Sequence, residues 1–142
     1  MLRDRWGSER MAAHGVLYEP AKLEGFVAED AGTGEPVGLL TYHRTPGACE
    51  IVTLDALVEG QGVGTALVAA AAALGDARLW VITTNDNVHA LRWYERRGFR
   101  VVAVHEGAVD QSRATLKPEI PPAAPDGIPI RDEIELELVQ PQ

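Results

Sequence analysis

Two short segments of the chain combine residue types and spacings that could do chemistry. The first is a glycine-rich stretch, Gly60-Gln61-Gly62-Val63-Gly64, between a predicted strand and a predicted helix. Unpaired N–H groups at a helix start, together with the helix dipole, favour an anion, and glycines let the backbone approach a phosphate closely. The stretch lacks the Gly-Lys-Ser/Thr of a Walker A loop and the glycine spacing of dinucleotide-binding proteins. It therefore predicts either a phosphate-binding turn or a tight turn before a core helix.

The second segment runs from Asn87 to Phe99 and contains a second predicted helix. Asn87, Ala90 and Tyr94 are three and four residues apart, so they lie on one face of that helix. Simpler roles exist for each residue type, since asparagine often caps a helix and tyrosine often packs in a core. Taken alone, this segment leaves both interpretations open.

In this order and at this separation, the two segments resemble the GNAT superfamily of acyl-CoA-dependent N-acyltransferases. The first is similar to that family's pyrophosphate-binding motif, Gln/Arg-x-x-Gly-x-Gly/Ala, although Glu59 stands in place of the Gln or Arg. The second is similar to the family's Asn-x-x-Ala-x-x-x-Tyr-x-x-x-Gly-Phe motif. It matches every specified position, through Asn87, Ala90, Tyr94, Gly98 and Phe99. The resemblance covers residues 26–105, the predicted CoA-binding core.

The resemblance implies that acetyl-CoA is the acyl donor, bound as a substrate and without a metal. Backbone groups of Ala56, Leu57 and Val58 would bind the pantetheine arm. The pyrophosphate would be held by backbone N–H groups of six consecutive residues: Gln61, Gly62, Val63, Gly64, Thr65 and Ala66. Asn87 would bind the pantetheine or nearby backbone, and Tyr94 would lie beside the thioester sulfur and protonate the leaving thiolate. A net charge of -8 suits an anion held by backbone dipoles rather than by lysines.

An acceptor amine must lose its proton before it attacks the thioester, because an alkylammonium group has a pKa of ~10.4. Glu50 begins the third predicted strand, where some members of the family carry a glutamate base. In a regular strand Glu50, Val52 and Leu54 share one face and Asp55 lies on the other, so Asp55 would need a bulge to enter the same site. The alternative role for Glu50 is a solvated charge at a strand edge.

The elements that must position these residues follow from hydrophobic periodicity. Apolar, alternating or β-branched runs predict six strands: Phe26–Glu29, Pro36–Tyr42, Cys49–Leu57, Leu79–Thr83, Phe99–His105 and Ile134–Val139. Apolar positions at helical spacing predict three helices: Gly62–Leu74, Val88–Arg97 and a short one over Ala108–Leu116. The fold class is therefore α/β, and the resemblance implies a central mixed, partly splayed sheet with helices on both faces.

The N-terminal segment departs from the family pattern, which begins with a strand and a long helix. Only Met1–Glu24 precede the first predicted hairpin, so the N-terminal strand and part of the first helix are expected to be missing. Short helical turns are expected around Trp6, Met11 and Leu17. The sheet edge at residues 26–29 or 36–42 would then be covered by a homodimer or by residues 2–18.

Length and composition predict one GNAT-like domain over residues 1–142. Within it, residues 106–130 form a long, proline-rich loop on the acceptor side, and residues 131–139 hold the last strand. The charge of -8 argues against a nucleic-acid partner, and the longest apolar stretch is too short to span a bilayer. Cys49 is the lone cysteine, and the four histidines lack metal-ligand spacing, so no metal is expected. These features favour a cytoplasmic protein.

The predicted function is transfer of an acetyl group from acetyl-CoA to a primary amine, either a small-molecule amine or a protein amino group. An alternative is a degenerate CoA-binding module without turnover, which acts as a sensor or subunit. A third possibility is an interaction domain that pairs through an exposed strand. The departure at Glu59 and the short N-terminal segment support the second hypothesis.

Overall fold

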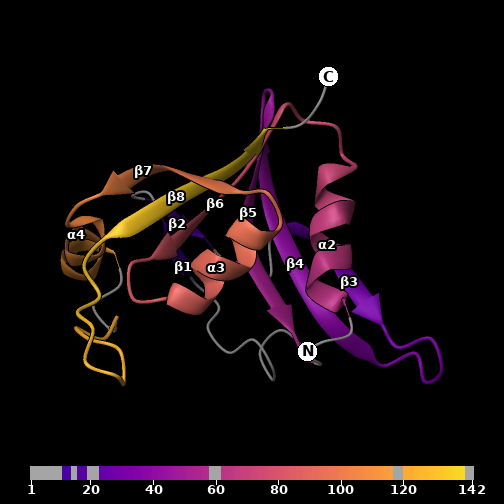
Figure 1. Ribbon diagram of the computed structural model, residues 1–142, viewed down its shortest axis with the longest axis horizontal. Helices are drawn as coiled ribbons and strands as arrows, with labels where there is room; N and C mark the ends of the chain where they lie inside the picture. Colours follow the sequence, from indigo (N-terminus) through magenta and orange to yellow (C-terminus); the bar gives the residue numbers. More distant parts are fainter. Residues whose placement is uncertain (1–10, 14–15, 19–22, 58–61, 117–119, 140–142) are drawn as a thin grey trace. The chain divides into compact units, whose positions relative to one another are not determined.

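The computed structural model describes residues 11–13, 16–18, 23–57, 62–116 and 120–139. The chain divides into two compact units. Their helices and strands are labelled in Figure 1. The first comprises Met1–Glu9, Pro20–Leu79 and Val139–Gln142, and the second comprises Arg10–Glu19 and Trp80–Leu138. The predicted α/β class is confirmed, since strands and helices alternate along most of the chain.

The sheet of the first unit is an antiparallel meander of β3 (Glu24–Glu29), β4 (Pro36–Thr45) and β5 (Ala48–Ala56). The turn between β3 and β4 is closed by the Asp30 carboxylate, which accepts hydrogen bonds from the amides of Gly32 and Thr33 at 2.8 and 3.0 Å. These two bonds lower the pKa of Asp30. The three predicted strands and their hairpin loop are confirmed.

Helix α2 (Val63–Ala72) packs on one face of this meander (Figure 1). Gly38 of β4 makes the close approach possible, because a Cβ there would lie 2.5 Å from Val63 Cγ1 and 3.0 Å from Leu67 Cδ1. The buried side chains of the helix are Leu67, Val68 and Ala71. The alanine-rich run is therefore the contact surface of a helix packed closely on a sheet.

The second unit contains most of β6 (Arg78–Thr84), followed by α3 (Val88–Arg96), β7 (Arg100–His105), α4 (Ala108–Thr115) and β8 (Glu133–Val139). Strand β8 lies between β6 and β7 in the strand order and pairs antiparallel with β7. Each of these elements was predicted within two residues of its observed ends. In the described part of the chain, no helix has the length and apolar character needed to span a membrane.

The N-terminal prediction of helical turns around Met11 and Leu17 is wrong. These residues lie in β1 (Met11–Ala13) and β2 (Val16–Tyr18), which pair antiparallel as a separate two-stranded sheet. Strand pairing with β-favouring Val16 and Tyr18 overrides the helix propensity of Met-Ala-Ala. Trp6 lies outside the described residues.

Candidate functional site

The glycine turn begins α2 in a conformation that favours glycine. Gly62 is the N-cap residue, with φ 75° and ψ 12°, which is the left-handed region. No described atom lies within 4 Å of where a Cβ at Gly62 would be, so the preference for glycine there is set by the backbone conformation. The first helical turn carries no acidic side chain and Gly62 provides no side-chain cap. These features suit an anion held by backbone N–H groups.

The predicted phosphate donors divide into two groups. The amide of Ala66 already donates to the Gly62 carbonyl at 2.9 Å, so it has no N–H left for an anion. The amides of Val63 and Gly64 precede it in the first helical turn, where an α-helix offers no carbonyl partner. The predicted contacts at Val58 and Gln61, like Glu59, lie outside the described residues.

At the end of β5, the backbone N–H groups of Ala56 and Leu57 point in opposite directions, one away from β4 and one toward it. The Leu57 amide donates to the Val37 carbonyl of β4 at 2.7 Å, so the sheet uses this N–H. Ala56 faces Gly38 as a non-hydrogen-bonded pair, and its own N–H and C=O therefore point away from β4. Of the predicted pantetheine contacts in the described residues, Ala56 has the more suitable backbone orientation.

A β-bulge in β5 changes which side chains share a face. Thr41 lies opposite Thr53, but Tyr42 lies opposite Ile51, so Val52 is the extra residue. Opposed residues in an antiparallel pair point to the same face, and side chains alternate along each strand. The bulge therefore resets the alternation of β5 between residues 51 and 53.

The expectation that Glu50 and Asp55 lie on opposite faces is consequently wrong. Glu50 lies opposite His43 and Asp55 lies opposite Leu39, and both of these β4 residues face away from Gly38 and α2. Glu50 is 2% exposed, which excludes the alternative role of a solvated strand-edge charge. The first unit thus carries two carboxylates on one face of its sheet, one of them buried.

Cys49 lies on the opposite face and has the character of a core residue. It is fully buried and is a free thiol. Burial raises the pKa of Cys49 to about 11, and nearby Asp76 contributes in the same direction. A thiol with this pKa is almost wholly protonated at neutral pH, so it is a poor nucleophile.

Asn87 occupies the N-cap of α3. Its side-chain oxygen accepts a hydrogen bond from the Ala90 amide at 3.1 Å, and the Asn87 side chain is exposed. The capping bond commits the oxygen of the carboxamide to the helix, which leaves its NH2 group as the end that can donate to a ligand.

Tyr94 is buried in an aromatic cluster near the end of α3. Its ring makes edge-on contacts with Trp93 and Phe99, each with centroids 5.1 Å apart. Gly98, at φ 92°, ends the helix and turns the chain so that the Phe99 amide donates to the Tyr94 carbonyl at 3.1 Å. The Tyr-x-x-x-Gly-Phe spacing therefore places the turn at Gly98 so that Phe99 packs against Tyr94.

The Tyr94 hydroxyl has a different environment from the ring. The residue is 6% exposed, and within the described ranges no group forms a hydrogen bond with this hydroxyl. Burial raises the pKa of Tyr94, so the phenol keeps its proton at neutral pH. A buried hydroxyl normally has a hydrogen-bond partner, so this one is suited to meet a bound molecule.

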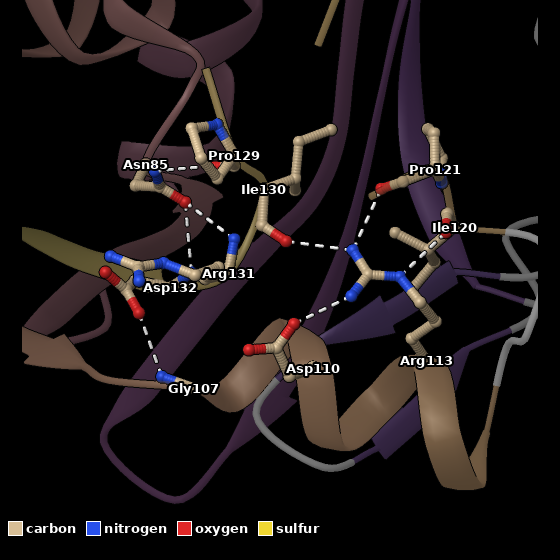
Figure 2. A network of polar contacts seen from close by, with 10 residues as sticks. All are labelled: Asn85, Gly107, Asp110, Arg113, Ile120, Pro121, Pro129, Ile130, Arg131 and Asp132. Carbon is tan, nitrogen blue, oxygen red and sulfur yellow. Dashed lines mark hydrogen bonds and ion pairs between the residues drawn. The ribbon is translucent and has the colours of Figure 1, made fainter. Parts of the chain in front are cut away.

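Asn85 is a structural residue that the sequence motifs did not indicate. Its side-chain oxygen accepts from the amides of Arg131 and Asp132, both at 3.0 Å, and its nitrogen donates to the Pro129 carbonyl at 2.8 Å (Figure 2). Its partners lie 44 to 47 residues away in sequence, so no local pattern could reveal the role.

Arg113 of α4 is a second residue that binds the proline-rich segment 106–130 (Figure 2). Its guanidinium donates to three loop carbonyls, those of Ile120, Pro121 and Ile130, each at 2.9 Å. It also donates to Asp110 at 2.7 Å. The predicted long loop is therefore largely irregular, but one arginine and Asn85 hold its described part against α4 and the end of β6.

The mixed α/β fold thus carries a helix that begins at a left-handed glycine and a second helix with a buried tyrosine. A sequence model of the acetyltransferase (GNAT) family matches residues 2–99, and the chain belongs to this family.

Three similar proteins illustrate this relationship. YdhI of Bacillus subtilis (strain 168) is 41% identical over 133 residues, which cover 91% of this chain and 82% of that protein. YxbD of the same strain is 41% identical over 141 residues, or 95% and 86% of the two chains. A Bacillus subtilis acetyltransferase solved in complex with CoA has a TM-score of 0.62 and 25% identity, and the match covers 77% of this chain and 72% of that one.

Proposed function

We propose that the protein is an N-acetyltransferase that moves the acetyl group of acetyl-CoA to a primary amine by direct attack. Its family and its similarity to an acetyltransferase with bound CoA support acyl-CoA chemistry. The observation that carries the proposal is the Tyr94 hydroxyl, which is buried and unpaired within the described residues on a helix capped by Asn87.

The acyl donor is bound mainly by backbone groups in this proposal. The first-turn amides after Gly62, those of Val63, Gly64 and Thr65, hold the pyrophosphate. The outward N–H and C=O of Ala56 bind the pantetheine arm, and the Asn87 NH2 group donates to the same arm. The left-handed Gly62 and the uncapped start of α2 support this assignment, as does the absence of acidic side chains from that turn.

The chemical step needs a base and an acid. The ammonium group of the acceptor loses one proton to Glu50, directly or through a water molecule, and the nitrogen lone pair then forms the new C–N bond. The nitrogen loses its second proton to solvent as the tetrahedral intermediate collapses to the amide. The C–S bond breaks and its electron pair remains on sulfur. Tyr94 donates a hydrogen bond and then its proton to this thiolate, and it regains a proton from solvent. The buried Glu50 carboxylate and the protonated Tyr94 phenol support these two roles.

The test is CoA release from acetyl-CoA in the presence of a panel of primary amines, from small diamines to peptides with free amino groups. Release that depends on a particular amine, with the acetylated amine as product, supports the proposal. Intact CoA binding without amine-dependent release contradicts it and favours the CoA-binding module.

We also propose that the enzyme acts in the cytoplasm as a homodimer. The free thiol of Cys49 supports a reducing compartment. Strand β3 ends the strand order and exposes 48% of Val27, which supports pairing of a second copy along this edge. Light scattering of the purified protein tests the dimer, and a monomer at micromolar concentration would contradict it.

A further inference from the structure

An open pocket of about 540 Å³ lies within the second unit, along one side of α4. Its volume falls in the range of small-molecule binding sites. The end of β7, the start of β8 and one face of α4 line it. The polar lining residues are His105, Glu106, Gln111, Ser112, Thr115 and Glu133.

The face of α4 in this pocket is polar where a packed helix would be apolar. Ala108, Gln111, Ser112 and Thr115 are three, four and seven residues apart, so they share one side of the helix. Thr115 donates to the Gln111 carbonyl at 2.7 Å, which occupies its hydroxyl proton. Ser112 is 4% exposed, and among the residues with described positions none forms a hydrogen bond with its hydroxyl. A buried hydroxyl of this kind favours a polar ligand.

The opposite wall of the pocket is acidic. Glu133, which is 2% exposed, lies opposite His105 in the β7–β8 pairing, and Glu106 follows at the exposed rim. The imidazole of His105 is hydrogen-bonded to another carboxylate, that of Glu135, at 2.9 Å. None of the described lining residues is a lysine or arginine, and Arg113 of α4 binds Asp110 and loop carbonyls.

We propose that this pocket binds the ammonium group of a small aliphatic amine. The ammonium donates hydrogen bonds to the carboxylates of Glu106 and Glu133 and to the Ser112 hydroxyl. Its alkyl chain lies against Ala108 and Leu116, which supply the apolar part of the lining. This binding needs no acyl donor, so the proposal stands whether or not the protein transfers acetyl groups.

The first test compares two ligands of the same shape and different charge. Butylammonium chloride and 1-butanol are titrated into the full-length ¹⁵N-labelled protein at constant ionic strength, without acetyl-CoA. Butylammonium is expected to shift the amides of Gln111, Ser112 and Thr115 in a saturable way, and butanol is not. Equal shifts with both ligands, or shifts spread over the chain, would overturn the proposal.

The second test removes the charges one at a time. Glu133→Gln is expected to weaken butylammonium binding about tenfold, which corresponds to about 1.4 kcal/mol. Glu106→Gln, at the exposed rim, is expected to weaken it a few fold, and so is Ser112→Ala. Glu95→Gln, an exposed change on α3, is the control and should leave the affinity unchanged.

Because Glu133 is buried, the Glu133→Gln variant risks misfolding, and thermal unfolding is measured alongside. If this variant does not fold, Glu106→Gln and Ser112→Ala decide the question. Affinities of these two variants that equal the wild-type value would overturn the proposal.

Discussion

Replacing Tyr94 with phenylalanine removes one hydroxyl and keeps the ring contacts with Trp93 and Phe99. Since no described residue bonds this hydroxyl, its loss costs no hydrogen bond with this part of the protein. The free energy of unfolding should stay the same or rise by about 1 kcal/mol, because an unpaired buried polar group is unfavourable. The turnover number should fall about 10²-fold, the low end for loss of a general acid.

The assay is steady-state CoA release at saturating acetyl-CoA and saturating amine, together with calorimetric measurement of CoA affinity. Tyr42→Phe is the matched control, because the Tyr42 hydroxyl donates to the Glu24 carboxylate at 3.2 Å. This control should lower the free energy of unfolding by about 1 kcal/mol and leave turnover unchanged. Tyr94→Phe should therefore lower turnover without lowering stability, whereas Tyr42→Phe should lower stability without lowering turnover.

Two results would refute this reasoning. Wild-type turnover in Tyr94→Phe, with chemistry rate-limiting, would make Tyr94 a packing residue. A fall in CoA affinity that matches the fall in turnover would show that the hydroxyl supports the binding site rather than the leaving thiolate.

Three further predictions concern the turn, the loop and the cysteine. Gly62→Asn tolerates the left-handed conformation, whereas Gly62→Asp adds a charge there, so calorimetry should show CoA affinity about tenfold lower for Asp than for Asn; equal affinities would place the phosphate elsewhere. Arg113→Ala removes three bonds to loop carbonyls and should lower the free energy of unfolding by about 2–3 kcal/mol in urea titrations. Arg113→Lys should not restore it, because a single ammonium cannot replace the guanidinium fork, and full rescue would contradict the network. Cys49, with its pKa raised to about 11, should resist a thiol reagent at pH 8 until the protein is unfolded, and rapid labelling of the folded protein would contradict its burial. Because the folded pKa exceeds the ordinary thiol value of ~8.5, this group's contribution to stability is constant below about pH 8.5 and falls as the pH rises toward 11.

The helices and strands that could be predicted from the sequence are those whose ends are marked by nearby residues, such as a capping side chain or a glycine. Asn87 and Gly98 bracket α3 because a capping side chain and a left-handed glycine act within a few residues of themselves. Gly62 marks the start of α2 for the same reason. The alternation of β4 and β5 likewise located both strands, and the two functional motifs lie on the elements predicted for them.

Other features depend on partners that no local pattern specifies. The bulge at Val52 is set by how β5 pairs with β4, and its sequence contains no glycine or proline that would signal it. That one extra residue changes the face on which Glu50 lies relative to Asp55. The loop contacts of Asn85 and Arg113 could not be predicted either, because most of their acceptors and donors are backbone groups, which every residue type offers.

The central claim is acetyl transfer from acetyl-CoA to an amine, and mass spectrometry of the acceptor tests it most directly. The protein is incubated with acetyl-CoA labelled isotopically in the acetyl group and with a panel of primary amines. The account predicts an amine that carries the labelled acetyl group, formed with the wild-type protein and about 10²-fold more slowly with Tyr94→Phe. Labelled acetate alone, or no labelled product while CoA still binds, would contradict it.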